Sequence, residues 1–262
     1  MPRRPAIVPT VVANWKMQLG VAESHQRLTV LKAAIKDKTF KAHMVVCPSY
    51  LALPGAKKLL RGTDIRLGAQ DIWWSDRGAN TGAVSPLDLQ EVGVEYVIIG
   101  HSERRQQVGE TDIMVGRKII SAVGHQIRPV VCVGETADDR AEGRHELIVR
   151  RQLTIAFKSV PPPTQDGRYL IAYEPVWAIG TGEPAPPEIA RDMLDFIYQT
   201  MIELYNNSIV NQNIRFLYGG SVDAANVGNY VRPNGYHGTL VGGASLDPEL
   251  FAILIEKITE QF

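Results

Sequence analysis

The chain is organised around YLIAYEPVWAIGTG, residues 169–182. Its first five residues form an apolar run with the length and composition of a buried strand. Glu174 follows at once, Pro175 stiffens the chain behind it, and a short apolar segment ends in Gly-Thr-Gly. A carboxylate held at a strand end before a closable segment suits a base that removes a proton from carbon while water is excluded. Taken alone, the pattern also fits a glutamate that caps a strand before a glycine-rich turn.

Apolar runs of strand length alternate with helix-like runs along the whole chain, which predicts a parallel sheet with helical crossovers. The expected strands span residues 8–13, 42–47, 65–69, 96–99, 128–133, 169–173, 214–217 and 238–241. The expected helices span residues 21–36, 50–60, 86–92, 112–123, 145–160, 188–205, 224–230 and 248–260.

Eight strand–helix units in 262 residues predict one α/β domain over residues 1–262, a closed (β/α)₈ barrel, whose usual length is about 250 residues. An open, doubly wound sheet is the alternative architecture. It leads us to expect a Gly-x-Gly-x-x-Gly turn after the first strand, and the sequence has none there.

The composition limits which binding partners and which cellular compartment we expect for the protein. Lys plus Arg and Asp plus Glu both number 28, so no overall basic field attracts nucleic acid or an anionic membrane. The only cysteines, Cys47 and Cys132, lie inside apolar runs, which indicates buried thiols of a reducing compartment. Pro9 interrupts the N-terminal apolar stretch, and no run reaches the ~18 apolar residues of a membrane span. We therefore expect a soluble, cytoplasmic protein.

Conspicuous polar groups and glycine pairs follow several expected strands. Asn14 and Lys16 follow the first strand, His101 follows the fourth, and Glu174 follows the sixth. Glycine pairs follow the seventh and eighth strands. In a barrel the carboxyl ends of all strands meet at one rim, where the active site lies. Any one of these groups alone fits a structural role, whereas their convergence on one rim predicts a catalytic site.

Five segments together resemble the triosephosphate isomerase family, in the same order along the chain. They are NWKM (14–17), GHSERR (100–105), the stretch 169–182, YGGSV (218–222) and LVGGASL (240–246). The resemblance covers nearly the whole chain and implies a TIM barrel that interconverts a phosphorylated hydroxy-ketone and its aldehyde isomer. It also implies no metal and no organic cofactor; the sequence has no Cys-x-x-Cys or His-x-x-x-His spacing that would indicate a metal site.

The resemblance assigns roles to the strand-end residues. It implies that Glu174 is the base and that Lys16 is a fixed cation beside the developing enediolate. It implies that His101 is a neutral electrophile, because Ser102 and Glu103 begin a helix whose dipole opposes a positive ring. Glu103 is expected to support Lys16. A carboxylate is also favourable at a helix N-terminus for its own sake, so this position alone explains Glu103 equally well. Asn14 is expected to add a hydrogen-bond donor.

The phosphate of the substrate requires donors without bulky side chains. Gly180, Ser221, Gly242 and Gly243 are expected to offer backbone N–H groups to it. The alternative for the glycine pairs is an ordinary turn between a strand and a helix.

The long polar segment 70–84 is expected to mediate a homodimer. In the resembling family it inserts into the neighbouring subunit, where its threonine, Thr81 here, supports Asn14 and Glu103. Ala83 stands where the family commonly has a glutamate, so an ion pair between subunits to the region of Arg104 is expected to be missing. Packing by Trp73–Trp74 is then expected to carry more of the interface.

Other departures concern the substrate and the lid, the closable segment that follows Pro175 and ends at Gly182. Asp71 replaces a common asparagine, His237 replaces a frequent acidic residue, and Pro184 restricts the far hinge of the lid. The Trp pair also resembles relatives that isomerise four-carbon sugar phosphates. Three functions therefore compete: triose-phosphate isomerisation, tetrulose-phosphate isomerisation, and a non-catalytic barrel used for binding. The intact set of Lys16, His101 and Glu174 argues against the third.

Overall fold

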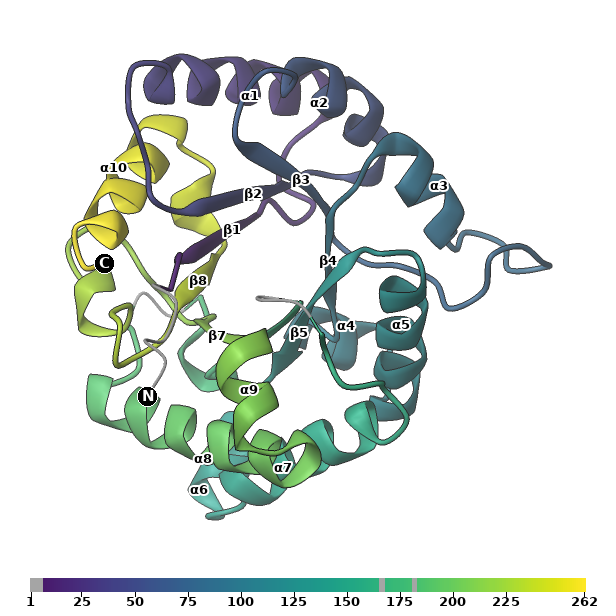
Figure 1. Ribbon diagram of the computed structural model, residues 1–262, viewed down its shortest axis with the longest axis vertical. Coiled ribbons are helices and arrows are strands. Elements are labelled where there is room, and N and C mark those ends of the chain that lie inside the picture. Colours follow the sequence, from purple (N-terminus) through teal and green to yellow (C-terminus); the bar gives the residue numbers. More distant parts are fainter. Residues whose placement is uncertain (1–6, 165–167, 181–182) are drawn as a thin grey trace.

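A computed structural model describes residues 7–164, 168–180 and 183–262. Eight parallel strands pair in sequence order and close into a barrel, because β8 pairs with β1. Helices surround the strands (Figure 1). The strands are β1 (Thr10–Asn14), β2 (His43–Cys47), β3 (Ile65–Ala69), β4 (Tyr96–Ile99), β5 (Arg128–Val133), β6 (Tyr169–Tyr173), β7 (Ile214–Tyr218) and β8 (Gly238–Val241). The expected (β/α)₈ barrel is confirmed, and the doubly wound alternative is wrong.

The helices follow the expected order with local differences. They are α1 (Val21–Ile35), α2 (Leu53–Leu59), α3 (Pro86–Val92), α4 (Ser102–Gln107), α5 (Asp112–Gly124), α6 (Ala137–Ala141), α7 (His145–Phe157), α8 (Pro187–Tyr205), α9 (Asn207–Asn213) and α10 (Pro248–Thr259). Four short 3₁₀ turns complete the described set: η1 (Tyr50–Ala52), η2 (Val176–Ala178), η3 (Val227–Asn229) and η4 (Gly243–Ser245).

The expected set of helices needs correction in four places. The expected helix 224–230 is only the turn η3, where the Asp223 side chain accepts the N–H groups of Ala225 and Asn226 and closes a local turn. The expected helix 50–60 divides into η1 and α2, and Pro54 stands in the first turn of α2. Helices α6 and α9 were not expected; the Thr136 side chain caps α6, and the Asn206 side chain caps α9 by accepting the N–H of Ile209.

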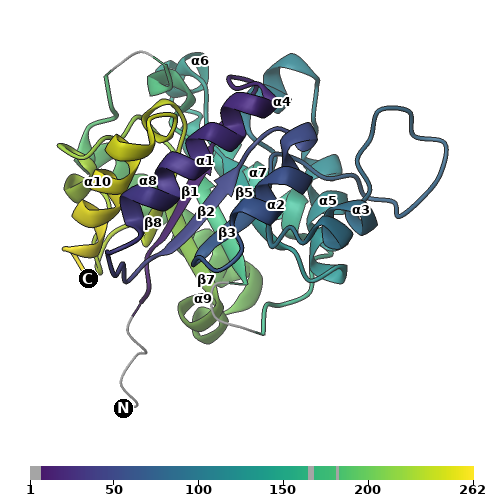
Figure 2. The ribbon, with the colours of Figure 1, turned by 90° about the horizontal axis from the view of Figure 1, so that it is seen from above.

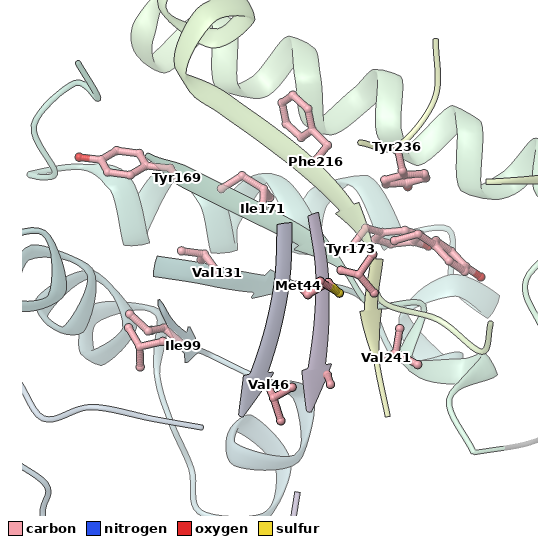
Figure 3. Close-up of a cluster of buried hydrophobic side chains, with 14 of the residues drawn as sticks. Met44, Val46, Ile99, Val131, Tyr169, Ile171, Tyr173, Phe216, Tyr236 and Val241 are labelled. Carbon is pink, nitrogen blue, oxygen red and sulfur yellow. The ribbon is translucent and has the colours of Figure 1, made fainter. Parts of the chain in front are cut away.

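Both faces of the barrel sheet are buried, which explains why the strands are continuous apolar runs. Alternate residues face opposite sides: Val12 belongs to the cluster inside the barrel, whereas Val11 and Ala13 belong to the layer between strands and helices. Figure 3 shows part of that outer layer, including Val131 and Ile171 on adjacent strands. The barrel interior is therefore packed, and a substrate can reach only its ends.

The loop between β3 and α3 projects away from the barrel (Figures 1 and 2). It corresponds to the polar segment 70–84, and residues 76–82 are all exposed. Cys47 and Cys132 are free and buried, as expected. Among the helices of the described residues, none is both long and apolar enough to cross a membrane.

Candidate active site

One cavity lies at the carboxyl ends of the barrel strands and has a volume of about 320 Å³. Every residue expected to touch the substrate lines it: Asn14, Lys16, His101, Glu174, Gly180, Ser221, Gly242 and Gly243. Ser102 and Glu103 contact these residues from the first turn of α4. Thr81 lies elsewhere, in the projecting loop beside a separate cavity that Trp73 also lines. Within one chain, Thr81 therefore does not belong to the catalytic cavity.

Glu174 stands one residue beyond β6, with only 2% of its surface exposed. Its Oε2 accepts the Ser102 backbone N–H at 2.9 Å, and its Oε1 lies 3.0 Å from His101 Nε2. Burial acts to raise the pKa of Glu174, but the His101 ring and the Ser102 N–H outweigh it and hold the pKa below its usual value. The carboxylate is thus ionised and ready to accept a proton at neutral pH.

His101 caps α4, and its Nδ1 accepts the backbone N–H of Glu103 at 3.2 Å. A nitrogen that accepts a hydrogen bond carries no proton, so a neutral ring carries its proton on Nε2, facing Glu174. Burial acts to lower the pKa of His101, but the Glu174 carboxylate outweighs burial and raises it. This direction differs from the expected neutral electrophile. The difference arises from the contact with Glu174, which helix-dipole reasoning did not include.

Lys16 adopts a positive φ of 51°, which is strained for a residue other than glycine. Two side chains hold this conformation. Asn14 Oδ1 accepts the Lys16 N–H at 3.0 Å, and Gln70 Nε2 donates to the Lys16 carbonyl at 2.7 Å. The Lys16 ammonium lies 2.6 Å from Glu103 Oε1, as the sequence predicts. Gln70 was missed; its position just after β3 is the signal that could have identified it.

The glycine turns after β7 and β8 line the same cavity as the base, and a Cβ added to Gly219 would lie 3.0 Å from Glu174 Cγ. A Cβ added to Gly242 would lie 3.4 Å from Lys16 Cε, so the lysine reaches this turn. Around Gly243 there is open space within 4 Å of such an atom. Gly180 has a positive φ of 77°, which favours glycine. Ser221 Oγ donates to the carbonyl of Ala178 at 3.2 Å and links the turn after β7 to the lid.

The start of the lid is held by a buried carboxylate that sequence reasoning missed. Glu135 is fully buried, and its Oε1 accepts Trp177 Nε1–H at 2.8 Å and Tyr173 O–H at 3.0 Å. The Arg140 guanidinium pairs with the same atom at 2.8 Å. Glu135 follows β5 directly, so its strand-end position could have identified it. Thr181 and Gly182, which complete the expected lid, lie outside the described residues.

The described residues contain no group of three or more His, Cys, Asp or Glu side chains arranged to hold a metal ion. The polar groups of the cavity comprise one carboxylate, one imidazole, one ammonium, the Asn14 amide, the Ser221 hydroxyl and backbone N–H groups beside glycines. Such a set can remove a proton from carbon, stabilise the resulting oxyanion and bind a small anion.

Comparison with known proteins gives a consistent result. The sequence profile of the family described as triosephosphate isomerase matches residues 9–258. The triosephosphate isomerase of Caldanaerobacter subterraneus subsp. tengcongensis is 42% identical over 247 residues, which cover 94% of this chain and 98% of the relative. That of Thermoanaerobacter sp. is 43% identical over 249 residues, with the same coverage of both chains. That of Roseiflexus sp. is 41% identical and covers 97% of this chain and 98% of the relative.

Proposed function

Because the chain belongs to the triosephosphate isomerase family, we propose that it interconverts dihydroxyacetone phosphate and D-glyceraldehyde 3-phosphate. It is an aldose–ketose isomerase, an intramolecular oxidoreductase, and this step belongs to glycolysis and gluconeogenesis. The observation that carries the proposal is the convergence of Lys16, His101 and Glu174 on one cavity with the glycine turns. The catalytic unit is one domain, residues 1–262.

Glu174 removes the carbon-bound proton from one carbon and returns it to the neighbouring carbon. Between these steps the substrate is an enediolate with one negative charge, and its remaining hydroxyl proton passes from the oxygen of the first carbon to the oxygen of the second. Nε2–H of His101 donates a hydrogen bond to the oxygen that gains charge, and the Lys16 ammonium stabilises the same charge. The reaction needs no redox partner, because the electrons move only within the substrate. These residues therefore supply the chemistry without a cofactor.

Glu174 must turn from His101 to the substrate before it acts. In the described conformation its two oxygens contact Ser102 and His101. Exchange of these partners for the substrate carbon makes Nε2–H of His101 available to the carbonyl. The pKa of His101 then loses the contribution of the neighbouring carboxylate, which favours the neutral ring that the sequence predicts.

The phosphate binds to backbone N–H groups of Gly180, Ser221, Gly242 and Gly243. All four residues line the same cavity, and the Lys16 side chain, which supplies positive charge, approaches Gly242. A phosphate needs several donors in a small space, and these short side chains leave that space open.

The test is a steady-state assay of the purified protein on triose and tetrulose phosphates. We expect a higher kcat/KM for the triose by about 10-fold or more, because a closed site built for three carbons must deform to admit a fourth. A preference for the tetrulose would favour the second isomerase. If the folded protein turns over neither substrate, the result would favour the third function, a non-catalytic barrel used for binding. Glu174→Gln is the matched control and should abolish turnover without loss of the fold.

The protein is also proposed to be a cytoplasmic homodimer. A two-fold dimer is the commonest soluble assembly, and the free buried thiols suit a reducing compartment. Exposed apolar side chains gather on loops at the carboxyl end of the barrel: Met17 is 96% exposed and Leu51 is 82% exposed. Gln70 donates to the carbonyls of both Lys16 and Cys47, so the loops after β1, β2 and β3 form one surface. With zero net charge, no nucleic-acid or membrane partner is proposed.

The charged and aromatic groups near this surface are partly satisfied within the chain. Arg104, whose partner-subunit ion pair was expected to be missing, contacts Asp71 at 2.9 Å. Trp73 and Trp74 stack on each other with ring centroids 3.6 Å apart, and Arg117 lies over the Trp74 ring. The part that the Trp pair plays in the proposed interface stays a prediction.

A further inference from the structure

Gln152 of α7 binds both backbone polar groups of one residue, Gly134, at the end of β5. Its Oε1 accepts the Gly134 N–H at 2.8 Å, and its Nε2 donates to the Gly134 carbonyl at 2.9 Å. The Gln152 side chain is buried, with 5% of the residue exposed. A primary amide carries a donor and an acceptor, as a peptide group does. The Gln152 side chain therefore makes the two hydrogen bonds that a neighbouring strand would make to Gly134, which lies just beyond the end of β5.

Gly134 packs directly against the backbone of Glu174. A Cβ added to Gly134 would lie 1.7 Å from the Glu174 carbonyl oxygen, far inside van der Waals contact. The Glu174 N–H also donates to the Val133 carbonyl at 2.8 Å. Any shift of the Gly134 peptide therefore moves the backbone that carries the base.

Open space adjoins Glu174 on the side that faces Gly134 and α7. A cavity of about 470 Å³ lies behind Glu174, and both Gln152 and Thr136 line it. Its wall thus leaves space into which the strand end could relax. The two hydrogen bonds from Gln152 oppose that movement, because they tie Gly134 to the long helix α7.

We propose that Gln152 is a positioning residue for the isomerase reaction, which acts on Glu174 through Gly134. It does not touch the substrate cavity, whose lining residues do not include it. The inference rests on the proposed function and extends it from the reacting groups to the helix layer. Its chemical requirement is a side chain that can accept from Gly134 N–H and donate to Gly134 C=O at the same time.

The first test is Gln152→Met, which keeps an unbranched side chain of similar length and removes both hydrogen bonds. We expect kcat to fall about 10- to 100-fold with KM changed less than about 2-fold, since displacement of a catalytic group by about 1 Å costs on this order. The primary deuterium isotope effect, measured with substrate labelled at the transferred position, should exceed that of the wild type. A change in folding alone would not raise this isotope effect.

Leu153→Met is the matched control, because Leu153 is the next residue of α7, is fully buried and belongs to the hydrophobic layer. It should lower the unfolding midpoint without changing kcat or the isotope effect. If Gln152→Met retains wild-type kcat and isotope effect, the proposal is wrong. An equal loss of kcat in both variants, with unchanged isotope effects, would also overturn it.

Gln152→Glu keeps the test decisive if Gln152→Met does not fold. The introduced carboxylate places an acceptor against the Gly134 carbonyl, whereas its protonated form can donate to that carbonyl again. The ratio of variant to wild-type kcat should therefore rise as pH is lowered through the pKa of the introduced group. A ratio that does not change with pH would contradict the proposal. Failure of the wild type to turn over any triose phosphate would instead contradict the proposed function.

Discussion

Glu135 and Trp177 are joined by a 2.8 Å hydrogen bond that ties the end of β5 to the start of the lid. The carboxylate is fully buried, and Trp177 lies within the turn η2, three residues after Glu174. Val176 N–H also donates to the Glu135 carbonyl at 3.2 Å. The first turn of the lid is therefore anchored to the barrel on the side of the base.

Trp177→Phe should destabilise the protein by about 1.5–3 kcal/mol, the usual value of a hydrogen bond to a charged group. The substitution keeps an aromatic ring but removes the N–H, which leaves the buried Glu135 with one donor fewer. Urea unfolding at neutral pH measures the change. Trp74→Phe is the control, because its ring stacks on Trp73 and the same substitution keeps that stack. If both substitutions lower the free energy of unfolding equally, the loss comes from the smaller aromatic ring and not from the hydrogen bond to Glu135.

Glu174→Asp should lower kcat on the order of 10²-fold, because the shorter side chain withdraws the carboxylate by about 1 Å from the substrate carbon. KM should change little, since the phosphate contacts belong to the glycine turns. Steady-state kinetics on the triose phosphate test this. The control is Asp139→Glu, which lengthens a carboxylate in the cap of α6, outside the substrate cavity. A Glu174→Asp enzyme with wild-type kcat would remove Glu174 from the role of base.

Glu174→Gln should lower the pKa of His101, because the Glu174 carboxylate raises it in the free enzyme. Nitrogen NMR of the imidazole during a pH titration measures the pKa in both proteins. In the variant we expect the neutral ring, protonated at Nε2, down to a lower pH than in the wild type. An unchanged pKa would mean that the carboxylate at 3.0 Å does not control the ring.

The same pair gives folding stability a defined pH dependence. The pKa of Glu174 is lowered in the folded state, so its contribution is present above its usual value of 4.5 and is lost as pH falls through the lowered pKa. The pKa of His101 is raised, so its contribution is complete below its usual value of 6.5 and is lost as pH rises through the raised pKa. The difference in unfolding free energy between wild type and Glu174→Gln should therefore be largest between pH 4.5 and 6.5. Chemical unfolding across this range measures it, and a difference that grows above pH 8 would contradict the assignment.

Much of the fold was predictable because a barrel buries both faces of each strand. Eight apolar runs in regular alternation with helices identified the strands, and polar residues or glycine pairs after several of the runs identified the rim. Helix α9 was missed because Asn206 caps it through local hydrogen bonding that polar composition alone does not reveal. The composition of residues 224–230 predicts a helix, whereas the Asp223 side chain closes a local turn and only the turn η3 forms there.

The Lys16–Glu103 pair was predictable, whereas other contacts between side chains of the site were not. The contact of His101 with Glu174 joins residues 73 positions apart, and only the folded barrel reveals that the carboxylate raises the pKa of the ring. Gln70 and Gln152 bind backbone groups. Every residue has such groups, so the sequence does not show which of them a glutamine will bind. Such supporting residues become visible only when strand ends and helices are placed in space.

The last prediction concerns the proposed dimer. Leu51→Asp places a charge on a side chain that is 82% exposed in the single chain, on the surface formed by the loops after β1 and β2. If that surface is the interface, burial of an unpaired carboxylate there is costly, and the dimer should dissociate. Sedimentation velocity at micromolar concentration measures the assembly, and activity per chain should fall on dilution in parallel. Leu250→Asp is the control, because Leu250 is 57% exposed on α10 and belongs to a different surface. A wild type that sediments as a monomer, or a Leu51→Asp variant that stays a fully active dimer, would contradict this interface.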